Sequence, residues 1–335
     1  MDTTPTKRPV IFSGIQPSGA LTLGSYMGAL QNWVNLSKTH DCFYCIVDMH
    51  TITVRQDPAE LRRRCLEQMA QYIACGLDPD ACCLFIQSHV REHAELGWVL
   101  NCYTMFGELS RMVQFKDKSA KNADNINAGL FTYPTLQAAD ILLYQTNLVP
   151  VGEDQRQHLE LTRDIATRFN GIYGDVFTIP DVSIPKEGAK IMSLADPTSK
   201  MSKSDSAGGC IYLMDKPEVI LKAFKRAVTD SDSEVRFDPA NKPGVSNLMN
   251  IYAVATGKSH AEIEAEFSGK GYGDFKVTVG ESVVELLRPF REKAELLMTD
   301  KAYLTDVYTK SAAHAARVAS KTLQKVHKKI GFVAR

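Results

Sequence analysis

Two lysines stand three positions apart in a short polar stretch near the middle of the chain, which reads Lys200-Met201-Ser202-Lys203-Ser204. Asp196-Pro197 precedes this stretch and Gly208-Gly209 follows it, which predicts a mobile loop and not the interior of a helix or strand. Two ammonium groups on flexible stems suit a polyphosphate whose charge moves during a reaction, and serine hydroxyls and loop amides add hydrogen bonds. The alternative is a solvated basic loop, so the function of this lysine loop depends on the rest of the chain.

A glycine-rich turn near the N-terminus is a second candidate for phosphate binding. It follows a short apolar strand over residues 10–13 and reads Gly14-Ile15-Gln16-Pro17-Ser18-Gly19-Ala20-Leu21-Thr22-Leu23-Gly24-Ser25. Glycines let the backbone approach a nucleotide closely, and the start of the following helix supplies unpaired amides to phosphate. The glycines are too widely spaced for the dinucleotide fingerprint, and the chain has no G-x-x-x-x-G-K-[ST] loop.

Strands and helices alternate in the first quarter of the chain. We expect strands over 10–13, 42–47 and 82–86, with helices over 23–36 and from Asp57-Pro58 to Gly76 between them. This alternation predicts a parallel sheet with right-handed crossovers. Because ligands bind at the carboxyl ends of such strands, residues 14–25 and the Asp48–His50 segment should share one rim.

The remaining segments favour helices. Residues 90–147 read as helical with a polar, mobile interruption over 116–127, and a strand over 148–151 leads into a helix from Gly152 to about 171. Beyond the lysine loop, helical patterns cover 217–228, 246–255, 261–267, 277–298 and 303–329. We therefore expect an α/β domain over 1–210, with a helical insertion at about 90–147, and a helical domain over 211–335 whose terminal helix packs back on the first.

Composition excludes several classes of protein. With 335 residues, 44% hydrophobic, 23% charged and a formal net charge of zero, any attraction to nucleic acid or membrane must be local. No apolar run approaches the ~20 residues of a membrane span, and no signal peptide is evident, so we expect a cytoplasmic protein without a membrane partner. Residues 310–335 form a local basic region without an acid: Lys310, Arg317, Lys321, Lys325, Lys328, Lys329 and Arg335.

Eight cysteines invite a metal or redox interpretation, which the strand pattern opposes. Cys42 and Cys45 lie on one predicted strand and should point to opposite faces, so they could not share a metal, and the adjacent Cys82 and Cys83 fail for the same reason. We expect all eight to be reduced packing residues and no metal site in the protein.

The lysine loop matches the second signature of the class I aminoacyl-tRNA synthetases, and residues 17–25 resemble the first, or HIGH, signature in its tryptophanyl branch. Thr22 and Ser25 stand where the general signature has histidines, and Ser25 departs from the asparagine usual in this branch. A contact to phosphate through the Gly24 and Ser25 backbone stays open. The chain also carries four further stretches of this branch: Val47-Asp48-Met49-His50, Ala138-Ala139-Asp140-Ile141-Leu142-Leu143-Tyr144, Val149-Pro150-Val151-Gly152-Glu153-Asp154-Gln155 and Ile191-Met192-Ser193-Leu194. Together these resemble the bacterial tryptophanyl-tRNA synthetases.

The resemblance implies a Rossmann-like catalytic domain, a helical domain that recognises tRNA, and a homodimer. It implies ligation of L-tryptophan to tRNA(Trp) through an adenylate, with ATP as substrate and Mg²⁺ held mainly by ATP. The basic region at 310–335 suits contacts to tRNA phosphates, or alternatively complements the dipole of a helix end.

Asp140 is the most informative residue for the amino acid, because it interrupts the apolar stretch 136–143. A buried carboxylate without a partner costs several kcal/mol, roughly, so Asp140 needs either an internal donor or a ligand. The resemblance implies that it accepts the indole N–H of tryptophan, which would reject phenylalanine because the carboxylate would stay unpaired.

The resemblance assigns the remaining site residues. Apolar walls of the tryptophan pocket are expected from Phe12, Val47, Val149 and Val151, and contacts to the α-amino group from Tyr133 and Gln155. His50 either borders the indole or is structural. Gln137 replaces a methionine common in the family, and its amide either hydrogen-bonds Asp140 or makes the pocket more polar. Contacts to the ATP phosphates are expected from Gln16, Pro17, Ser18, Gly24 and Ser25, and contacts to the departing pyrophosphate from Lys200, Ser202, Lys203 and Ser204. Contacts to the ribose are expected from Gly152, Glu153 and Asp154, and contacts to the adenine from Ile191 and Met201. Lys200, Lys203 and Gln16 are expected to be catalytic.

Three rival interpretations make different predictions. A tyrosyl-tRNA synthetase shares both signatures, but its pocket should recognise a phenol, which Asp140 and its flanking motifs oppose. A small-molecule adenylyltransferase would have little use for the long helical part. A non-catalytic RNA-binding paralogue should have lost the loop lysines, and both are present.

Overall fold

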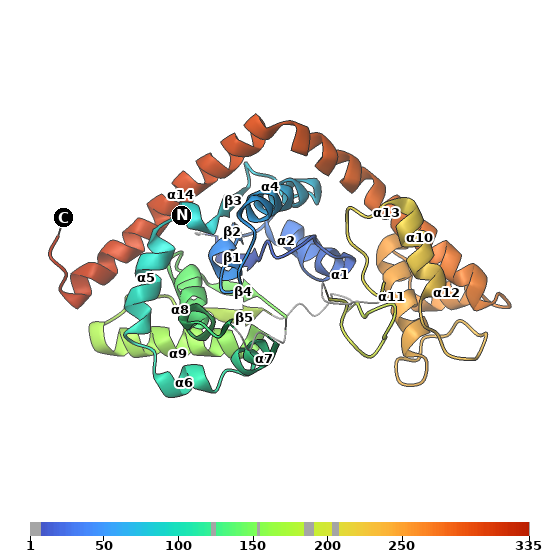
Figure 1. The fold of residues 1–335 in the computed structure, drawn as a ribbon, viewed down its shortest axis with the longest axis horizontal. Helices are drawn as coiled ribbons and strands as arrows, with labels where there is room; N and C mark the ends of the chain where they lie inside the picture. The colour runs from blue at the N-terminus through green and yellow to red at the C-terminus, as the bar shows by residue number, and fades with distance from the viewer. Residues whose placement is uncertain (1–7, 122–124, 153–154, 184–190, 203–207, 335) are drawn as a thin grey trace, which may run out of the picture.

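Five short strands form a parallel sheet in the computed structural model of the chain, which describes residues 8–121, 125–152, 155–183, 191–202 and 208–334 (Figure 1). The strands lie in the order β3-β2-β1-β4-β5, and each neighbouring pair is parallel. Their bounds are β1 Val10–Ile15, β2 Asp41–Ile46, β3 Cys82–Ile86, β4 Leu148–Pro150 and β5 Asp181–Ser183. The expected α/β class with crossovers is confirmed.

Both faces of the sheet are buried, which is why its central strands are apolar throughout. On one face Ile11, Tyr44 and Leu84 pack under α2 (Gln31–Leu36) and α4 (Pro58–Ala74). On the other face Phe12, Phe43 and Phe85 pack under α5 (Glu92–Asn101), α8 (Ala128–Leu142) and α9 (Arg156–Tyr173). Cys42 belongs to the first core and Cys45 to the second, which confirms that the two thiols point to opposite faces. All eight cysteines are free; Cys102, however, is exposed, which does not fit the packing role expected for it.

The long helix between β2 and β3 starts at the cap that the sequence predicts. Asp57 accepts a hydrogen bond from the Glu60 N–H and is followed by Pro58, which begins the helix as predicted. The helices are α1 Leu23–Ser25, α2 Gln31–Leu36, α3 Asp48–Thr51, α4 Pro58–Ala74, α5 Glu92–Asn101, α6 Phe106–Ser110, α7 Val113–Lys121, α8 Ala128–Leu142 and α9 Arg156–Tyr173, with a π-helical turn η1 Tyr26–Leu30 and a 3₁₀ turn η2 Gln87–His89.

The second part is helical: α10 Pro217–Arg226, α11 Pro243–Thr256, α12 His260–Glu266, α13 Tyr272–Thr299 and α14 Lys301–Ile330. Figure 1 shows α13 and α14 as an angled pair that joins the helical part to the sheet. α13 contacts α4, and α14 runs back along β3 and α5. No helix among the described residues is both long and apolar enough to cross a membrane.

Several boundaries differ from the prediction. The helix expected over 23–36 contains the π turn, in which the Gln31 N–H donates to the Tyr26 carbonyl. α9 begins at Arg156 and not at Gly152, and just before it the Gln155 N–H donates to the Gly152 carbonyl at 2.9 Å. The interruption predicted over 116–127 is wrong in its first half, which α7 occupies. β5 was not predicted, since its three partly exposed residues have no apolar alternation.

Candidate active site

Gly14 and the segment that follows it form one side of the rim at the carboxyl end of the sheet. A Cβ at Gly14 would lie 2.8 Å from Val47 Cγ1 and 2.9 Å from the Cys45 carbonyl oxygen, so only glycine allows β1 and β2 this approach. Gln16, Pro17 and Ser18 come next, with Pro17 buried and Ser18 exposed. The structure therefore brings the predicted phosphate residues to the rim that sheet topology required.

Thr22 caps the helix that opens the first signature. Its Oγ1 accepts a hydrogen bond of 3.1 Å from the Ser25 N–H and lies 3.0 Å from Ser25 Oγ. Ser25 thus takes part in a local cap, and a phosphate bound at its amide would have to share or replace that bond.

The two signature segments lie against each other. Residues 191–201 form a hairpin in which Met192 bridges Lys200 and the Met201 N–H donates to the Ile191 carbonyl at 3.0 Å. A Cβ at Gly24 would lie 3.6 Å from Met201 Cβ and 3.8 Å from Ile191 Cβ. Ile191 and Met201 are buried, so this contact fixes the base of the lysine loop beside the first signature.

The segment that follows the lysine loop also pairs with the first signature. The Leu23 N–H donates to the Ile211 carbonyl at 2.8 Å, and the Leu213 N–H donates to the Leu21 carbonyl at 2.9 Å. Both ends of the lysine loop are therefore held at the start of α1. Lys203, Ser204, Glu153 and Asp154 lie outside the described residues.

Asn247, on α11, anchors the hairpin from the helical part and was missed from the sequence. Its Oδ1 accepts from the Met192 N–H at 2.9 Å, and its Nδ2 donates to the Met192 carbonyl at 3.0 Å. The side chain is 3% exposed. Asn247 has polar neighbours in the sequence, Ser246 and Asn250, so no local pattern singles it out.

Asp140 lies on α8 at 1% exposure and accepts three hydrogen bonds from within the protein. His50 Nε2 lies 2.8 Å from Oδ2, while His93 Nδ1 and Gln87 Nε2 lie 2.6 Å and 2.7 Å from Oδ1. Because a carboxylate only accepts, each histidine nitrogen facing it carries a hydrogen. The internal donors left open from the sequence exist, and they are His50, Gln87 and His93.

These donors keep the carboxylate charged. Burial alone would raise the pKa of Asp140, but the charge of His50 and the hydrogen bonds from His50 and His93 outweigh it, and the pKa lies below its ordinary value. Carboxylate oxygens accept two hydrogen bonds each, so the three described donors leave Oδ2 capacity for one more. Gln87 and His93 were missed because nothing in the sequence pairs them with position 140.

The other residues predicted for the tryptophan site lie on the same side of the sheet as α8 or contact His50 and one another. Phe12, Val47 and Val149 belong to the core on the α8 side of the sheet, with Val151 packed against it. The Tyr133 ring lies edge-on to His50 at 6.2 Å between centroids, and its hydroxyl lies 2.7 Å from His158 Nε2. Gln137 Nε2 donates to Gln155 Oε1 at 3.5 Å, which joins the two predicted glutamines.

Two packed signature segments and a buried, hydrogen-bonded carboxylate define the candidate site, and comparisons give the class of the protein. The family model of the class I tRNA synthetases for tryptophan and tyrosine matches residues 4–288, so the chain belongs to that family. A tyrosyl-tRNA synthetase of Aeropyrum pernix is 18% identical over 91% of this chain and 90% of its own, with a TM-score of 0.66, which reflects the shared fold alone.

The likeness to the tryptophan enzymes is much closer. A tryptophanyl-tRNA synthetase of Mycoplasma pneumoniae is 36% identical over 97% of this chain and 98% of its own, with a TM-score of 0.90. One from Campylobacter jejuni, solved with ADP and tryptophan, is 34% identical over 96% of this chain and all (100%) of its own, with a TM-score of 0.84. Within the family, the chain falls in the tryptophanyl branch.

Asp140→Asn should destabilise the fold by roughly 3–5 kcal/mol, because it removes the charge that His50 and His93 satisfy and turns an amide towards their donors. Urea unfolding at pH 7 measures the difference in free energy. Asp164→Asn, at an exposed position on α9, is the matched control and should stay within about 0.5 kcal/mol of the parent.

The same pair of variants tests the charge state. Because the pKa of Asp140 is lower in the folded protein than in the unfolded chain, where it is about 3.9, the charged carboxylate stabilises the fold at any pH above about 3.9. This stabilisation is lost as the pH falls through the pKa of the folded state. The difference in unfolding free energy between the parent and Asp140→Asn should therefore decrease below about pH 4. If the two proteins unfold with the same free energy at pH 7, or if the difference stays constant down to pH 3, Asp140 is not charged in the folded protein.

Proposed function

We propose that this protein ligates L-tryptophan to tRNA(Trp), consuming ATP and releasing AMP and pyrophosphate. The observation that carries the proposal is its full-length likeness to tryptophanyl-tRNA synthetases, one of them solved with ADP and tryptophan. In the first step a tryptophan carboxylate oxygen forms a bond to the α-phosphorus of ATP, and the bond to pyrophosphate breaks. In the second, a 3′-terminal ribose hydroxyl of tRNA attacks the acyl carbon and AMP leaves.

Asp140 is proposed to select tryptophan by accepting the indole N–H at its remaining lone pair. His50, Gln87 and His93 hold the carboxylate in place and charged, so it acts as a fixed acceptor. Phenylalanine would fill the apolar space but leave that acceptor unpaired. The pocket walls are proposed to be Phe12, Val47, Val149 and Val151, with Gln137 and His50 at its border and Tyr133 and Gln155 at the α-amino group.

The lysine loop is proposed to stabilise the charge that leaves with pyrophosphate. A carboxylate is already an adequate nucleophile, so catalysis consists of positioning and charge stabilisation. Lys200 and Lys203, with Ser202 and Ser204, are assigned to the pyrophosphate. The other ATP contacts are assigned to Gln16, Pro17, Ser18, Gly24 and Ser25 for the phosphates, Gly152, Glu153 and Asp154 for the ribose, and Ile191 and Met201 for the adenine.

Mg²⁺ is proposed to reach the site on ATP. Among the described residues, no three His, Cys, Asp or Glu side chains are grouped so as to hold a metal ion. When bound to ATP, the ion would neutralise part of the phosphate charge.

The helical part over 211–335 is proposed to recognise tRNA, and residues 1–210 to hold the catalytic site. We assign the protein to the cytoplasm, and its eight free cysteines suit a reducing compartment.

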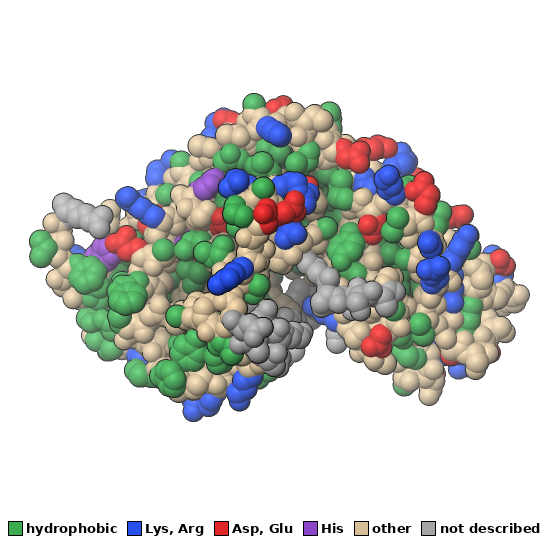
Figure 2. Space-filling view, viewed as in Figure 1, with side chains coloured by type: hydrophobic (Ala, Val, Ile, Leu, Met, Phe, Trp, Pro, Cys, Tyr) green, Lys and Arg blue, Asp and Glu red, His purple; other side chains and the backbone are tan. Residues whose placement is uncertain are grey.

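A homodimer is proposed through an apolar face on the catalytic part. Figure 2 shows hydrophobic side chains gathered over α5 and α6. Trp98 is 70% and Phe106 75% exposed there, and a cleft of about 370 Å³ lined by Ile52, Trp98 and Tyr133 lies beside them. Patches of this kind mark interaction sites, and a two-fold dimer would cover one on each subunit.

Amino-acid-dependent ATP–pyrophosphate exchange tests the function, with tryptophan, tyrosine and phenylalanine compared with and without tRNA. We expect exchange with tryptophan alone, because only the indole N–H meets Asp140. Exchange with tyrosine would indicate the tyrosyl activity instead, and RNA binding without any exchange would indicate a non-catalytic paralogue.

Lys203→Ala should raise the barrier to adenylate formation by about 2–4 kcal/mol, since the lysine acts on charge that develops in the transition state. Affinity for tryptophan should barely change, because the lysine contacts the other substrate. Exchange kinetics measure the first quantity and equilibrium tryptophan binding the second. Lys38→Ala, at an exposed position, is the control. An exchange rate equal to that of the control refutes the role.

Trp98→Glu combined with Phe106→Glu should convert a dimer to monomers at micromolar concentration, because charges replace the apolar contacts. Sedimentation velocity measures the mass. The control is Val219→Glu with Leu296→Glu, which alters side chains 50% and 69% exposed on α10 and α13 and should leave the dimer intact. A parent protein that sediments as a monomer argues against the interface.

A further inference from the structure

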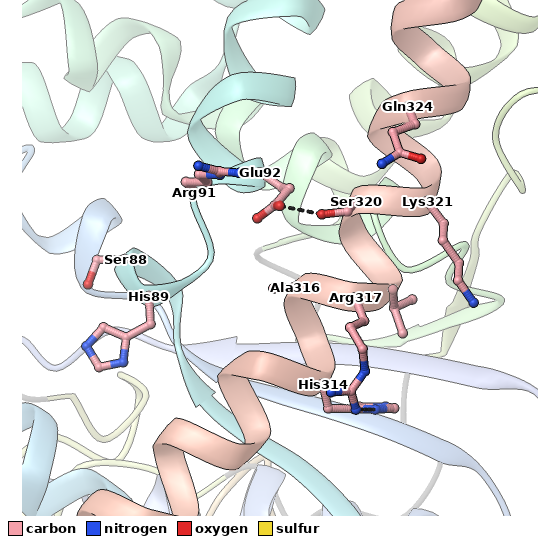
Figure 3. Close-up of a pocket in the computed structure, with 11 residues that line it drawn as sticks. Ser88, His89, Arg91, Glu92, His314, Ala316, Arg317, Ser320, Lys321 and Gln324 are labelled. Atoms are coloured by element: carbon pink, nitrogen blue, oxygen red, sulfur yellow. Dashed lines mark hydrogen bonds between the residues drawn. The ribbon is translucent and has the colours of Figure 1, made fainter. Parts of the chain in front are cut away.

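A surface cleft of about 710 Å³ lies between the start of α5 and the second half of α14, and none of its lining residues is among those assigned to ATP or tryptophan (Figure 3). Basic side chains come from both of its walls. His89 and Arg91 stand on one side, and His314, Arg317 and Lys321 project from α14 on the other.

The cleft carries an excess of positive charge in a chain whose formal net charge is zero. Arg91, Arg317 and Lys321 are exposed, and within the described residues none of them forms an ion pair with a carboxylate. Arg317 Nη2 lies 3.4 Å from His314 Nδ1, a contact that does not neutralise the guanidinium charge. Such unneutralised cations attract an anion, and the planar guanidinium groups match phosphate geometry.

Glu92 is the one acid among the described residues that line the cleft, and Arg91, Arg317 and Lys321 outnumber it. Glu92 is 5% exposed, and its Oε1 accepts a hydrogen bond of 2.5 Å from Ser320 Oγ, which ties α5 to α14. The two walls are therefore fastened together at the floor, while the basic groups stay at the solvent side. The basic side chains therefore stand on two walls whose separation is fixed.

One wall of the cleft belongs to the same segment that holds Asp140 in place. Gln87 and His93 donate to Asp140, and between them in the sequence His89, Arg91 and Glu92 line the cleft. The Ser88 N–H and Oγ both donate to Asp48, at 3.0 Å and 2.5 Å, which joins this wall to the end of β2. An anion bound in the cleft would thus lie beside the edge at which the reaction takes place.

We propose that this cleft binds the phosphate backbone of tRNA close to its acceptor end. The inference rests on the proposed function, since it names the binding surface of that reaction's second substrate. RNA is a polyanion that must bring its 3′-terminal ribose to the rim, and two walls of arginine, lysine and histidine suit a backbone of successive phosphates. Contacts of this kind fix the position of the RNA without reading its sequence.

Arg317→Glu combined with Lys321→Glu tests the cleft in the full-length protein. The Kd for tRNA should rise about tenfold or more, and the slope of log Kd against log salt should fall by about 2 as two phosphate contacts are lost. Tryptophan-dependent pyrophosphate exchange without tRNA should remain at the parental rate, which also reports an intact fold. Arg317→Ala with Lys321→Ala should give the same effect to a smaller degree.

Lys38→Glu with Arg62→Glu is the matched control, because it makes the same change in net charge at exposed positions outside the cleft. Its Kd for tRNA should stay within about threefold of the parent. Equal tRNA affinity in the cleft variant and this control would overturn the proposal and leave the proposed function standing. Absence of tryptophan-dependent exchange in the parent would instead overturn the proposed function.

Discussion

A buried negative charge that water cannot reach must be met by donors inside the protein, and the site is arranged around this requirement at Asp140. The donors come from three separate elements, α3, η2 and α5, and the carboxylate from a fourth, α8. Gln87 also accepts from the Met49 N–H at 3.1 Å, so the turns after β2 and β3 are bonded to each other as well as to α8. His93 Nε2 lies 2.7 Å from the Tyr144 hydroxyl, which extends the network into the aromatic core under the sheet. A carboxylate bound in this way has a fixed direction, and direction is what recognition of a single N–H group demands.

A second set of contacts determines where the lysine loop begins and ends. The hairpin of residues 191–201, the Leu21–Leu23 segment and Asn247 of α11 form one assembly of main-chain and amide hydrogen bonds. The core on this side of the sheet runs without a break from Ile11 and Tyr44 into Phe224 and Leu248 of the helical part. Any rotation of the helical part relative to the sheet must therefore act on the base of the loop through Asn247.

The sequence allowed the parallel sheet, the main helices and the rim to be predicted, because apolar periodicity and capping residues such as Asp57 are local signals. The two signatures were recognisable for the same reason. Gln87, His93 and Asn247 were not predictable, since each owes its role to a partner 47 or more positions away in the chain, and hydrogen bonds of that kind leave no periodic trace. β5 escaped because a three-residue edge strand with Asp181 and Ser183 has too little apolar content to stand out. The need of Asp140 for a partner was evident from its apolar neighbours, but the identity of its internal partners depended on the fold.

The path of α14 has a consequence for how the chain matures on the ribosome. Ala312, Ala315 and Leu323 complete the same core as Phe43 and Phe85, and the Cys83 thiol donates to the Ser311 carbonyl at 3.2 Å. That face of the sheet stays incomplete throughout most of translation, because the segment that closes it is synthesised more than 200 residues after β3. Until α14 has been synthesised, apolar residues on that face of the nascent α/β part remain exposed to solvent, and chaperones bind such exposed apolar surfaces.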